Sequence, residues 1–322
     1  MSISPLLSIV GWGAIGLLVL YVFYVVSLRS QGRPTRISII VVVLLLVIGI
    51  SLNALGAGLE HADFCQTPDC SRLAFPPHRT DNRAMRQTLA EIAAIDAVGP
   101  FCRVRFSAPD LAAALEPGRA VLARWPDAYL RRAWWPCAID ADAFSVLAHP
   151  AQIESLRTGD RVDVLGPVGR GFQVDVATRN LLLVAGSTSL AFTLGPLLPL
   201  ADRALPEGRS VTLAFAAPNP EVAYPVSSLS PAIEVIRAMD TDLIDLLSDA
   251  IAWADQVLAC GPTGFTTRLS AHIRSIRRPA PRGFFQALNP VHLPCGVGAC
   301  GVCRTGSRLA CVDGPVFELN DI

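Results

Sequence analysis

Four cysteines close to the C-terminus constrain this chain more than any other feature of its sequence. They stand in the spacing C-x4-C-x2-C-x7-C, at Cys295, Cys300, Cys303 and Cys311. Three glycines, Gly296, Gly298 and Gly301, are interleaved with them. Glycine lets the backbone turn tightly and brings its N–H groups close to a ligand. The stretch PCGVGACGVC, residues 294–303, therefore predicts a loop that folds back and gathers thiol groups at one point.

Such a group of thiols has three chemical uses. A C-x4-C-x2-C run with a more distant fourth cysteine is typical of a 2Fe-2S cluster. Residues 304–308, RTGSR, can form the turn that returns Cys311 as the fourth ligand. Zinc sites more often use two C-x2-C pairs, and this segment has one. Disulfides or free thiols are the third alternative. We predict a 2Fe-2S cluster with all four cysteines as its ligands.

Two uncharged apolar segments lie at the other end of the chain. Residues 6–28 and 37–55 contain no charged side chain, and each is close to the ~20 helical residues that cross a bilayer. The whole chain is 52% hydrophobic and only 17% charged, against roughly 25% charge in soluble domains. A signal peptide is less favoured because no basic residue precedes the first segment, and two buried core helices of this length are rare. Residues 1–57 are therefore predicted to form a two-helix membrane anchor.

Charge and chemistry give opposite expectations for the side of the membrane. The connector carries Arg29, Arg33 and Arg36, whereas residues 1–5 carry no basic side chain. The positive-inside rule therefore places the connector in the cytoplasm and everything after Leu55 outside. Cluster assembly and cofactor supply are cytoplasmic, so we expect the rest of this multi-pass membrane protein in the cytoplasm. Lys+Arg and Asp+Glu are both 27, and this balance indicates no nucleic-acid partner.

Residues 58–97 are predicted to be a linker and a short helix. Gly, Pro and Asp recur up to residue 83, where few apolar positions are periodic. Cys65 and Cys70 lie in this part, either as a disulfide or as free thiols. Apolar residues then recur at helical spacing, at Met85, Leu89, Ile92 and Ile95. This period predicts a helix over 84–95.

The remaining chain shows two folding patterns before the cysteine segment. In residues 98–175, short alternating segments such as FCRVRF are bounded by Gly and Pro, which predicts a small β-barrel. In residues 176–285, apolar strands alternate with helical segments, which predicts a parallel α/β sheet. Strands are expected over RNLLLVAGS, SVTLAFAAPN and DQVLACGP, and helices over LAFTLGPLLPLADRAL, AIEVIRAMDTDLIDLLSDAIAWA and TGFTTRLSAHIRSI. Residues 286–322 form the cluster segment.

The cysteine segment, followed by CVDGPVFELNDI in residues 311–322, resembles a known family. It is similar to the iron–sulfur segment of the electron-transfer subunits of type 1B dihydroorotate dehydrogenases, which belong to the ferredoxin-reductase superfamily. The resemblance implies a flavin-binding β-barrel, a nucleotide-binding α/β domain and a C-terminal 2Fe-2S segment, in the order predicted here. The two transmembrane helices are an addition to that pattern. The cofactors it implies are the 2Fe-2S cluster, FAD and NAD(P)H.

For the flavin, the resemblance implies two residues in YLRRAWWPCAI. Arg132 corresponds to the arginine that contacts the flavin phosphate, and a guanidinium suits this bidentate role. Trp134 corresponds to the aromatic residue that stacks on the flavin ring. The family's hydroxyl falls on Trp135 or Ala138, so its function there is lost. A barrel rim or an edge that faces a partner is the alternative reading of these side chains.

The loop LGPVGRGF resembles the family's barrel-end loop and implies Gly166, Pro167 and Gly171 as cofactor-binding residues. A structural turn is the alternative, because glycine and proline are typical of tight turns. The Gly-Thr pair that binds pyrophosphate in the family has no counterpart in residues 147–152.

For the nucleotide, the resemblance implies Gly186, Cys260, Gly261 and Pro262. The family has several glycines after the first strand of this domain, whereas VAGSTSLAF keeps only Gly186. Hydroxyl groups and helix N–H groups can still bind an anion, but the added side chains occupy cofactor space. ACGP corresponds to the family's Cys-Gly-Pro motif near the nicotinamide, with a buried cysteine and a turn as the alternative. The missing glycines argue against NAD(P)H binding.

Two functions agree with these features. The first is a membrane-anchored oxidoreductase subunit that passes electrons from NAD(P)H or a partner through FAD to the cluster. It needs no catalytic side chain, because the cofactors carry the chemistry. The second is a non-catalytic accessory or structural subunit of a membrane redox complex, which retains the cluster and has lost flavin and NAD(P)H. Both require a partner redox protein. The resemblance does not imply pyrimidine synthesis, for which a catalytic subunit is needed.

Overall fold

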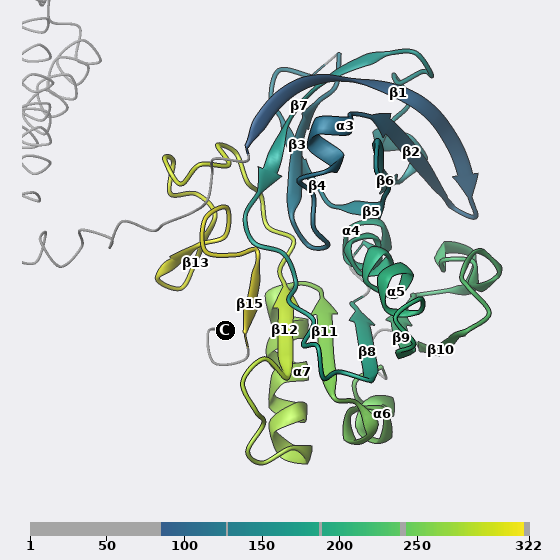
Figure 1. Cartoon of the computed structure of the whole chain (residues 1–322), viewed down its shortest axis with the longest axis vertical. Coiled ribbons are helices and arrows are strands. Elements are labelled where there is room, and N and C mark those ends of the chain that lie inside the picture. The colour runs from purple at the N-terminus through teal and green to yellow at the C-terminus, as the bar shows by residue number, and fades with distance from the viewer. Residues whose placement is uncertain (1–84, 127, 187–188, 239–242, 319–322) are drawn as a thin grey trace, which may run out of the picture. The chain divides into compact units, whose positions relative to one another are not determined.

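The computed structural model describes residues 85–318, except 127, 187–188 and 239–242 (Figure 1). The chain divides into two compact units, Met1–Pro77 and His78–Ile322, and every described residue belongs to the second. The predicted membrane segments, their arginine connector, Cys65 and Cys70 lie outside the described residues. The second unit consists of a barrel, an α/β layer and the cysteine segment.

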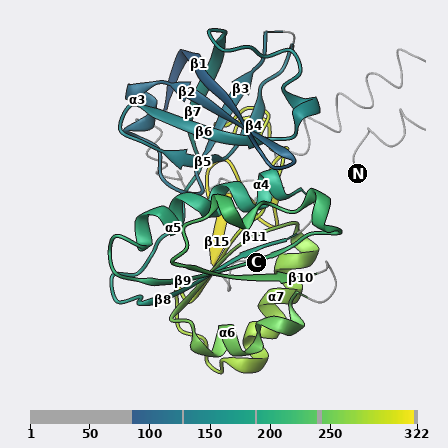
Figure 2. The ribbon, with the colours of Figure 1, turned by 90° about the vertical axis from the view of Figure 1, so that its right-hand side faces the viewer.

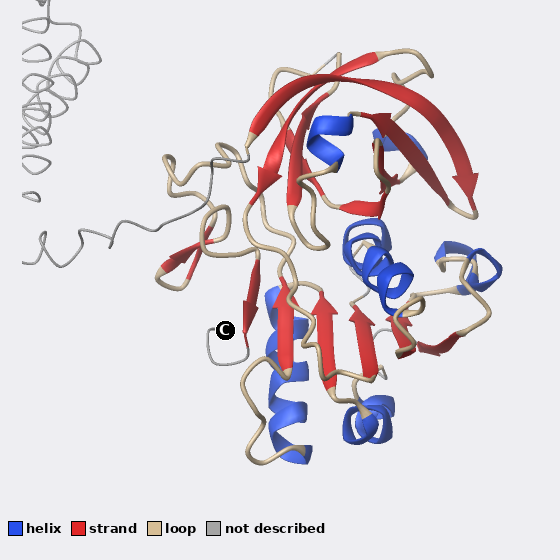
Figure 3. Ribbon diagram, in the orientation of Figure 1, coloured by secondary structure: helices blue, strands red, loops and turns tan. Residues whose placement is uncertain are grey.

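Seven antiparallel strands form the barrel (Figure 3). Their order across the sheet is β4-β3-β7-β1-β2-β6-β5. In chain order they are β1 (Arg86–Val98), β2 (Phe101–Ser107), β3 (Ala120–Arg124), β4 (Arg132–Trp134), β5 (Pro136–Ile139), β6 (Ala143–Ala148) and β7 (Arg161–Val168). Alternate side chains fill the interior: Val162 and Val164 are fully buried in the barrel core. Asp163, between them, is on the outer face, because successive strand residues point to opposite sides.

The helix predicted over 84–95 is wrong, because residues 86–95 belong to β1. The strand pairs with β2 on one side and β7 on the other. Its register shifts between Ile92 and Ala94, as in a β-bulge. A bulge adds one residue and displaces the apolar positions that follow it. The spacing of Ile92 and Ile95 therefore mimics a helical period, while Leu89 is 61% exposed.

A six-stranded sheet carries the α/β layer, in the order β10-β9-β8-β11-β12-β15. Its strands are β8 (Asn180–Ala185), β9 (Ser210–Ala216), β10 (Ile233–Ala238), β11 (Gln256–Cys260), β12 (Phe285–Leu288) and β15 (Val316–Glu318). The first five are parallel, and β15 is antiparallel to β12. The strand order reverses between β8 and β11. Open parallel sheets bind ligands beyond the carboxyl ends of their strands at such a reversal.

Helices cover both faces of this sheet. The helices α4 (Leu190–Leu194) and α5 (Leu198–Ala204) lie between sheet and barrel (Figure 2). The helices α6 (Ser248–Trp253) and α7 (Thr263–Ile276) lie on the opposite face. The helix predicted over 232–254 is wrong in its first part, because β10 pairs there with β9 as the outermost strand of the sheet.

The C-terminal segment packs against both layers. After β12, the chain forms the cysteine loop and the hairpin of β13 (Arg304–Thr305) and β14 (Arg308–Leu309), and then adds β15 beside β12. Cys303 and Cys311 belong to the same hydrophobic core as Leu122 of the barrel and Leu181 of the sheet. This shared core fixes the cysteine segment against the barrel and the sheet.

A membrane-spanning helix is not found in the described part of the chain. Between residues 85 and 318, outside the gaps given above, no helix is both long and apolar enough to cross a bilayer. The helix α7 has 14 residues. At 1.5 Å per residue it extends about 21 Å, against ~30 Å of hydrocarbon core.

Candidate functional site

A cavity of about 490 Å³ opens where the barrel meets the carboxyl ends of the parallel strands. Ser189, Phe192 and Thr193 follow β8, and Pro262 follows β11. Residues 289–292 follow β12 and also line the cavity. The barrel closes the other side with residues 132–135 and Gln152. The cavity therefore occupies the place at which an α/β sheet of this order binds ligands.

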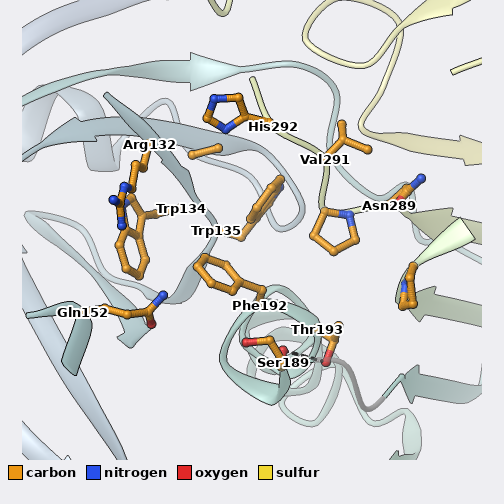
Figure 4. Close-up of a pocket in the computed structure, with 13 residues that line it drawn as sticks. Arg132, Trp134, Trp135, Gln152, Ser189, Phe192, Thr193, Asn289, Val291 and His292 are labelled. Atoms are coloured by element: carbon orange, nitrogen blue, oxygen red, sulfur yellow. Dashed lines mark hydrogen bonds between the residues drawn. The ribbon is translucent and has the colours of Figure 1, made fainter. Parts of the chain in front are cut away.

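Aromatic rings form much of the cavity wall (Figure 4). The ring of Trp134 lies 5.1 Å from that of Trp125 and 5.2 Å from that of Phe192, measured between centroids. Trp135 meets Phe192 edge to face at 6.3 Å. Trp134 is 1% exposed and Trp135 is 4% exposed. Flat, apolar and rigid walls of this kind suit a planar aromatic ligand.

The two indole N–H groups in this wall are unsatisfied. Nε1 of Trp134 and Nε1 of Trp135 are both buried and have no hydrogen-bond partner among the described residues. A buried donor without a partner costs about 1–3 kcal/mol, so such groups are rare in folded proteins. A flavin ring offers carbonyl oxygens and ring nitrogens as acceptors. The aromatic wall and its orphan donors therefore fit a flavin.

A second cavity of about 930 Å³ adjoins the first. The two share Arg132, Gln152 and His292 in their walls. Residues 128–131 of the loop between β3 and β4 add a further wall. Arg132 is exposed and stands where the two cavities meet, so its guanidinium can hold a phosphate group of a ligand that extends through both. The structure thus places the predicted residues Arg132 and Trp134 in one site.

The glycines predicted for a nucleotide are used in packing. A Cβ at Gly186 would lie 3.0 Å from Cδ1 of Phe265, and a Cβ at Gly261 would lie 2.6 Å from the same atom. The backbone of Gly186 is also engaged: its N–H donates to Cys260 O at 2.8 Å, and its carbonyl accepts from Thr193 Oγ1. Both glycines admit the Phe265 ring instead of a pyrophosphate group.

The helical segment after β8 changes its hydrogen-bond pattern after α4 and then continues into α5. α4 comprises Leu190–Leu194, and a 3₁₀ turn, Gly195–Leu197, follows directly. Its first residues have no side-chain cap. Whether this N-terminus binds an anion therefore stays a prediction, because the two residues directly before Ser189 lie outside the described part of the chain.

Cys260 is buried in the core, whereas Pro262 reaches the cavity wall. Cys260 is fully buried, burial raises the pKa of its thiol well above the usual value, and the thiol donates to Phe192 O at 3.5 Å. It is not part of the cavity wall. Pro262 begins α7 as its N-cap and lines the smaller cavity.

The barrel-end glycines lie away from both cavities. A Cβ at Gly171 would lie 2.6 Å from the carbonyl oxygen of Pro117, and Gly166 packs on Val121. Pro167 is part of β7. Shortly after β7, Arg170 forms a β-bridge with Pro315 of the C-terminal segment. This arrangement supports a structural part for all three residues, but Gly166 and Pro167 lie in strand β7 and not in the predicted turn.

The four cysteines of the C-terminal loop come together in two pairs. The sulfurs of Cys303 and Cys311 are 3.3 Å apart, and both residues are buried. Cys295 is half-buried and hydrogen-bonded to the exposed Cys300. Among the described residues, no three His, Cys, Asp or Glu side chains are arranged to hold one metal ion. In a 2Fe-2S cluster each tetrahedral iron takes two bridging sulfides and two thiolates, so ligands in two pairs fit it.

Backbone N–H groups point at these sulfurs. Gly298 N donates to Cys311 Sγ at 3.2 Å, and Cys311 N donates to Cys303 Sγ at 3.4 Å. Burial opposes ionisation of Cys295, but the N–H groups of residues 297, 299 and 300 outweigh it and lower the pKa of Cys295 to about 7. Burial and the neighbouring Cys303 raise the pKa of Cys311 to about 12. Amide donors of this kind stabilise thiolates that ligate a metal centre.

Sequence reasoning missed several residues of the cavity wall. These are Gln152, Phe192, Thr193 and Asn289–His292. The segment 289–292 directly follows the short buried strand β12, which the sequence prediction did not include. Recognising this strand would have identified residues 289–292, because residues that follow parallel strands gather at one edge of the sheet. Gln152 and Phe192 carry no comparable signal, because they reach the cavity through the packing of the barrel on α4.

Comparisons with known proteins agree with the cysteine site and the fold described above. The model of the family described as the iron–sulfur cluster binding domain of dihydroorotate dehydrogenase B matches residues 292–322. The chain is 32% identical over 190 residues to the electron transfer subunit of dihydroorotate dehydrogenase B (NAD(+)) of Shouchella clausii, covering 53% of this chain and 68% of the relative. It is 23% identical over 226 residues to the subunit of the same name of Clostridium perfringens, covering 64% of this chain and 86% of the relative.

Among solved structures, the fold is similar to that of the NADH-dependent reduced ferredoxin-NADP oxidoreductase, with a TM-score of 0.58 and 21% identity over 73% of this chain and 89% of that one. This likeness confirms the predicted ferredoxin-reductase-like fold. The relatives are electron transfer subunits of a dehydrogenase. These relatives contradict the predicted localisation as a multi-pass membrane protein, and a membrane complex is not supported as a partner.

Proposed function

The chain belongs to the family of the electron transfer subunits of dihydroorotate dehydrogenase B, and we propose that it moves electrons between a flavin and a 2Fe-2S cluster for a partner subunit. The cluster domain and the fold family support the 2Fe-2S cluster and FAD as its cofactors. The proposed flavin site is the pair of adjoining cavities. The proposed cluster ligands are Cys295, Cys300, Cys303 and Cys311.

One observation carries this proposal: the cavity and the cysteine loop are parts of one short stretch of chain. Val291 and His292 line the cavity, and Cys295 follows three residues later. Three residues of extended chain reach at most about 11 Å. A planar redox group in the cavity and a metal centre on these cysteines would therefore be close neighbours, as electron transfer between them requires.

The residues have distinct parts in this function. Trp134, Trp135 and Phe192 would hold a flat ring and exclude water from it, while Arg132 would neutralise phosphate. The barrel strand β3 supports the cysteine loop, because Gly296 packs directly on Leu122. A flavin bound there would supply the conversion between two-electron and one-electron transfer. Because the Phe265 ring fills the space beside Gly186 and Gly261, the electron source is proposed to be a protein partner.

The partner is proposed to be a catalytic subunit that docks close to the cluster. The relatives are named as electron transfer subunits, and such a subunit implies a second subunit on which the substrate reacts. The cysteine loop offers an exposed edge for this contact, since Cys300 is exposed and Val302 is 62% exposed. Apolar exposed residues of this kind are frequent at protein interfaces.

The test is a visible spectrum of the anaerobically purified chain, before and after dithionite, with iron and sulfide determined on the same sample. We expect flavin bands together with an iron–sulfur envelope that bleaches on reduction. Cys303→Ser should lose the iron–sulfur envelope, while Cys102→Ser, a half-buried cysteine on β2, should keep it. If both variants keep their iron, the cluster ligands proposed here are refuted.

The flavin site has its own pair of variants. Arg132→Gln should weaken FAD binding about tenfold or more, because a charge-assisted contact to phosphate contributes ~1.5–3 kcal/mol. Arg161→Gln removes the same charge from an exposed position on β7 that lines neither cavity, and should bind FAD like the wild type. Equal affinities of all three proteins, measured by flavin fluorescence quenching, would contradict the proposed site.

A further inference from the structure

The loop between β3 and β4 forms a wall of the larger cavity, yet its tip is not anchored in the core. Tyr129 is 97% exposed and Leu130 is 75% exposed. Both line the cavity together with Trp125, at the start of the loop. Trp125 is buried, and its indole N–H donates to Gln152 O at 3.1 Å. The shape of this wall therefore depends on how the two ends of the loop are held.

Two arginines stand opposite each other at those ends. Ala123 pairs with Arg132 in the ladder of β3 and β4, so the next pair outward is Arg124 and Arg131. Strand alternation puts this pair on the face of the sheet opposite to Arg132. Like charges directly opposite on neighbouring strands repel and destabilise the pairing. Without a counter-ion, the stem of the loop would open.

One carboxylate compensates both charges. Asp163 on β7 is the cross-strand neighbour of Arg124 and forms an ion pair with its guanidinium at 3.3 Å. It accepts from Arg131 at 2.5 Å and from Gln87 Nε2 at 2.8 Å. The Asp163 side chain is 7% exposed, against 49% for Arg124 and 28% for Arg131. A carboxylate this deeply buried is strongly held, and its loss leaves its partners uncompensated.

We propose that Asp163 is a positioning residue of the flavin site, which clamps both ends of the 125–131 loop and leaves Arg132 as the arginine that faces both cavities. The proposal rests on the flavin function proposed above. It also explains the different positions of the two adjacent arginines: Asp163 holds Arg131 at the wall of the larger cavity, whereas Arg132 lines both cavities. Asp163 itself lines neither cavity.

The first test is FAD affinity, measured by titrating flavin into the full chain depleted of flavin. Asp163→Asn keeps the shape of the side chain and removes its charge, and we expect FAD to bind about tenfold more weakly, with cluster absorption unchanged. The matched control is Asp140→Asn, which breaks an exposed ion pair with Arg105 elsewhere in the barrel. It should bind FAD like the wild type.

Rescue separates positioning from a general loss of structure. Removing one of the opposed charges in the double variant Asp163→Asn with Arg124→Gln should restore most of the lost affinity, because no like-charged pair remains across the stem. Arg124 lines neither cavity, so it cannot act by direct contact with the ligand. An unrecovered affinity in the double variant would overturn the clamp.

A second measurement needs no flavin. Hydrogen–deuterium exchange of the β4 amides should become about tenfold faster in Asp163→Asn, return toward the wild-type rate in the double variant, and stay unchanged in Asp140→Asn. Wild-type exchange and wild-type FAD affinity in Asp163→Asn would refute the proposal. A wild-type chain that binds no FAD would instead refute the proposed flavin function, while the exchange rates would still decide whether Asp163 clamps the loop.

Discussion

Replacing Gly261 by alanine tests whether the Cys-Gly-Pro segment serves packing or a nucleotide. The new Cβ would lie 2.6 Å from Cδ1 of Phe265, about 1 Å closer than an ordinary carbon–carbon contact. Gly261 does not have a positive φ, so the backbone itself accepts alanine. Phe265 is 6% exposed and cannot swing into solvent without leaving the core. Overpacking of this kind costs typically ~1–3 kcal/mol, which is the expected loss of unfolding free energy.

The assay is equilibrium urea unfolding of four variants followed by circular dichroism. Phe265→Ala alone should cost about 3–5 kcal/mol, but in that background Gly261→Ala should cost almost nothing, because the clashing ring is gone. The control is Gly264→Ala, three residues away on α7, where a Cβ meets nothing within 4 Å. It should be neutral or stabilise by up to ~1 kcal/mol.

Two results would refute this reasoning. An equal cost of Gly261→Ala with and without the Phe265 ring would show that the ring is not what the Cβ meets. A Gly261→Ala protein as stable as the Gly264→Ala control, but with NADH-dependent reduction abolished, would show that the glycine admits a nucleotide after all.

Three further predictions follow from buried or capping groups. Burial raises the pKa of the Cys137 thiol to about 12, from 9.0 for an ordinary thiol. Because the thiol of the unfolded chain ionises first, the free energy of unfolding should fall as pH rises above about 9, by up to ~1.4 kcal/mol per pH unit. Urea unfolding across that pH range should show a smaller fall for Cys137→Ala than for the wild type. Trp135→Phe removes an unpaired indole N–H and should weaken FAD binding about two- to tenfold in a fluorescence titration, and unchanged affinity would rule out a hydrogen bond from this donor. At the end of α6, the Arg277 guanidinium donates to Ala252 O at 2.6 Å and to Ala254 O at 2.7 Å. Arg277→Gln should therefore lower the free energy of unfolding by about 1–3 kcal/mol. The same substitution of an exposed arginine without such contacts should change the free energy of unfolding little.

The elements predicted well are those with a strong and uninterrupted period. The predicted helix TGFTTRLSAHIRSI coincides with α7, whose buried residues Phe265, Leu269 and Ile273 are spaced by four. The continuous apolar runs of β8 and β11 were also recognised, because a parallel strand covered on both faces is apolar throughout. In these cases local pattern and tertiary burial agree.

The elements predicted wrongly are those in which tertiary contacts override the local pattern. In β1 a bulge shifts the apolar positions, and the resulting spacing resembles a helix. In β10 only one neighbouring strand is present, and residues such as Glu234 and Arg237 are exposed, so the segment lacks the apolar run of an inner strand. Sequence periodicity alone contains neither kind of information.

For the site, the sequence predicted β8 and β11 but neither β12 nor the use of each residue. Arg132, Trp134 and Pro262 reach the cavity wall, and their part in cofactor binding stays a prediction. Gly186 and Gly261 match a nucleotide motif, yet their free space is filled by Phe265, a residue that the motif does not include. Whether a glycine admits a ligand or a neighbouring ring depends on the packing partner, which only the structure identifies.

Gly296 brings the cysteine loop into direct contact with the barrel. Gly296 has φ +69, and a Cβ there would lie 2.8 Å from Leu122 Cδ1. Leu122 is directly opposite Ala133 on β4, and Ala133 lines the smaller cavity. Neighbouring strands are about 4.8 Å apart, so roughly one strand spacing separates the surface that carries the cysteine loop from the cavity wall. Any side chain at position 296 would strain the backbone and push the loop outward, which increases the distance over which electrons must pass.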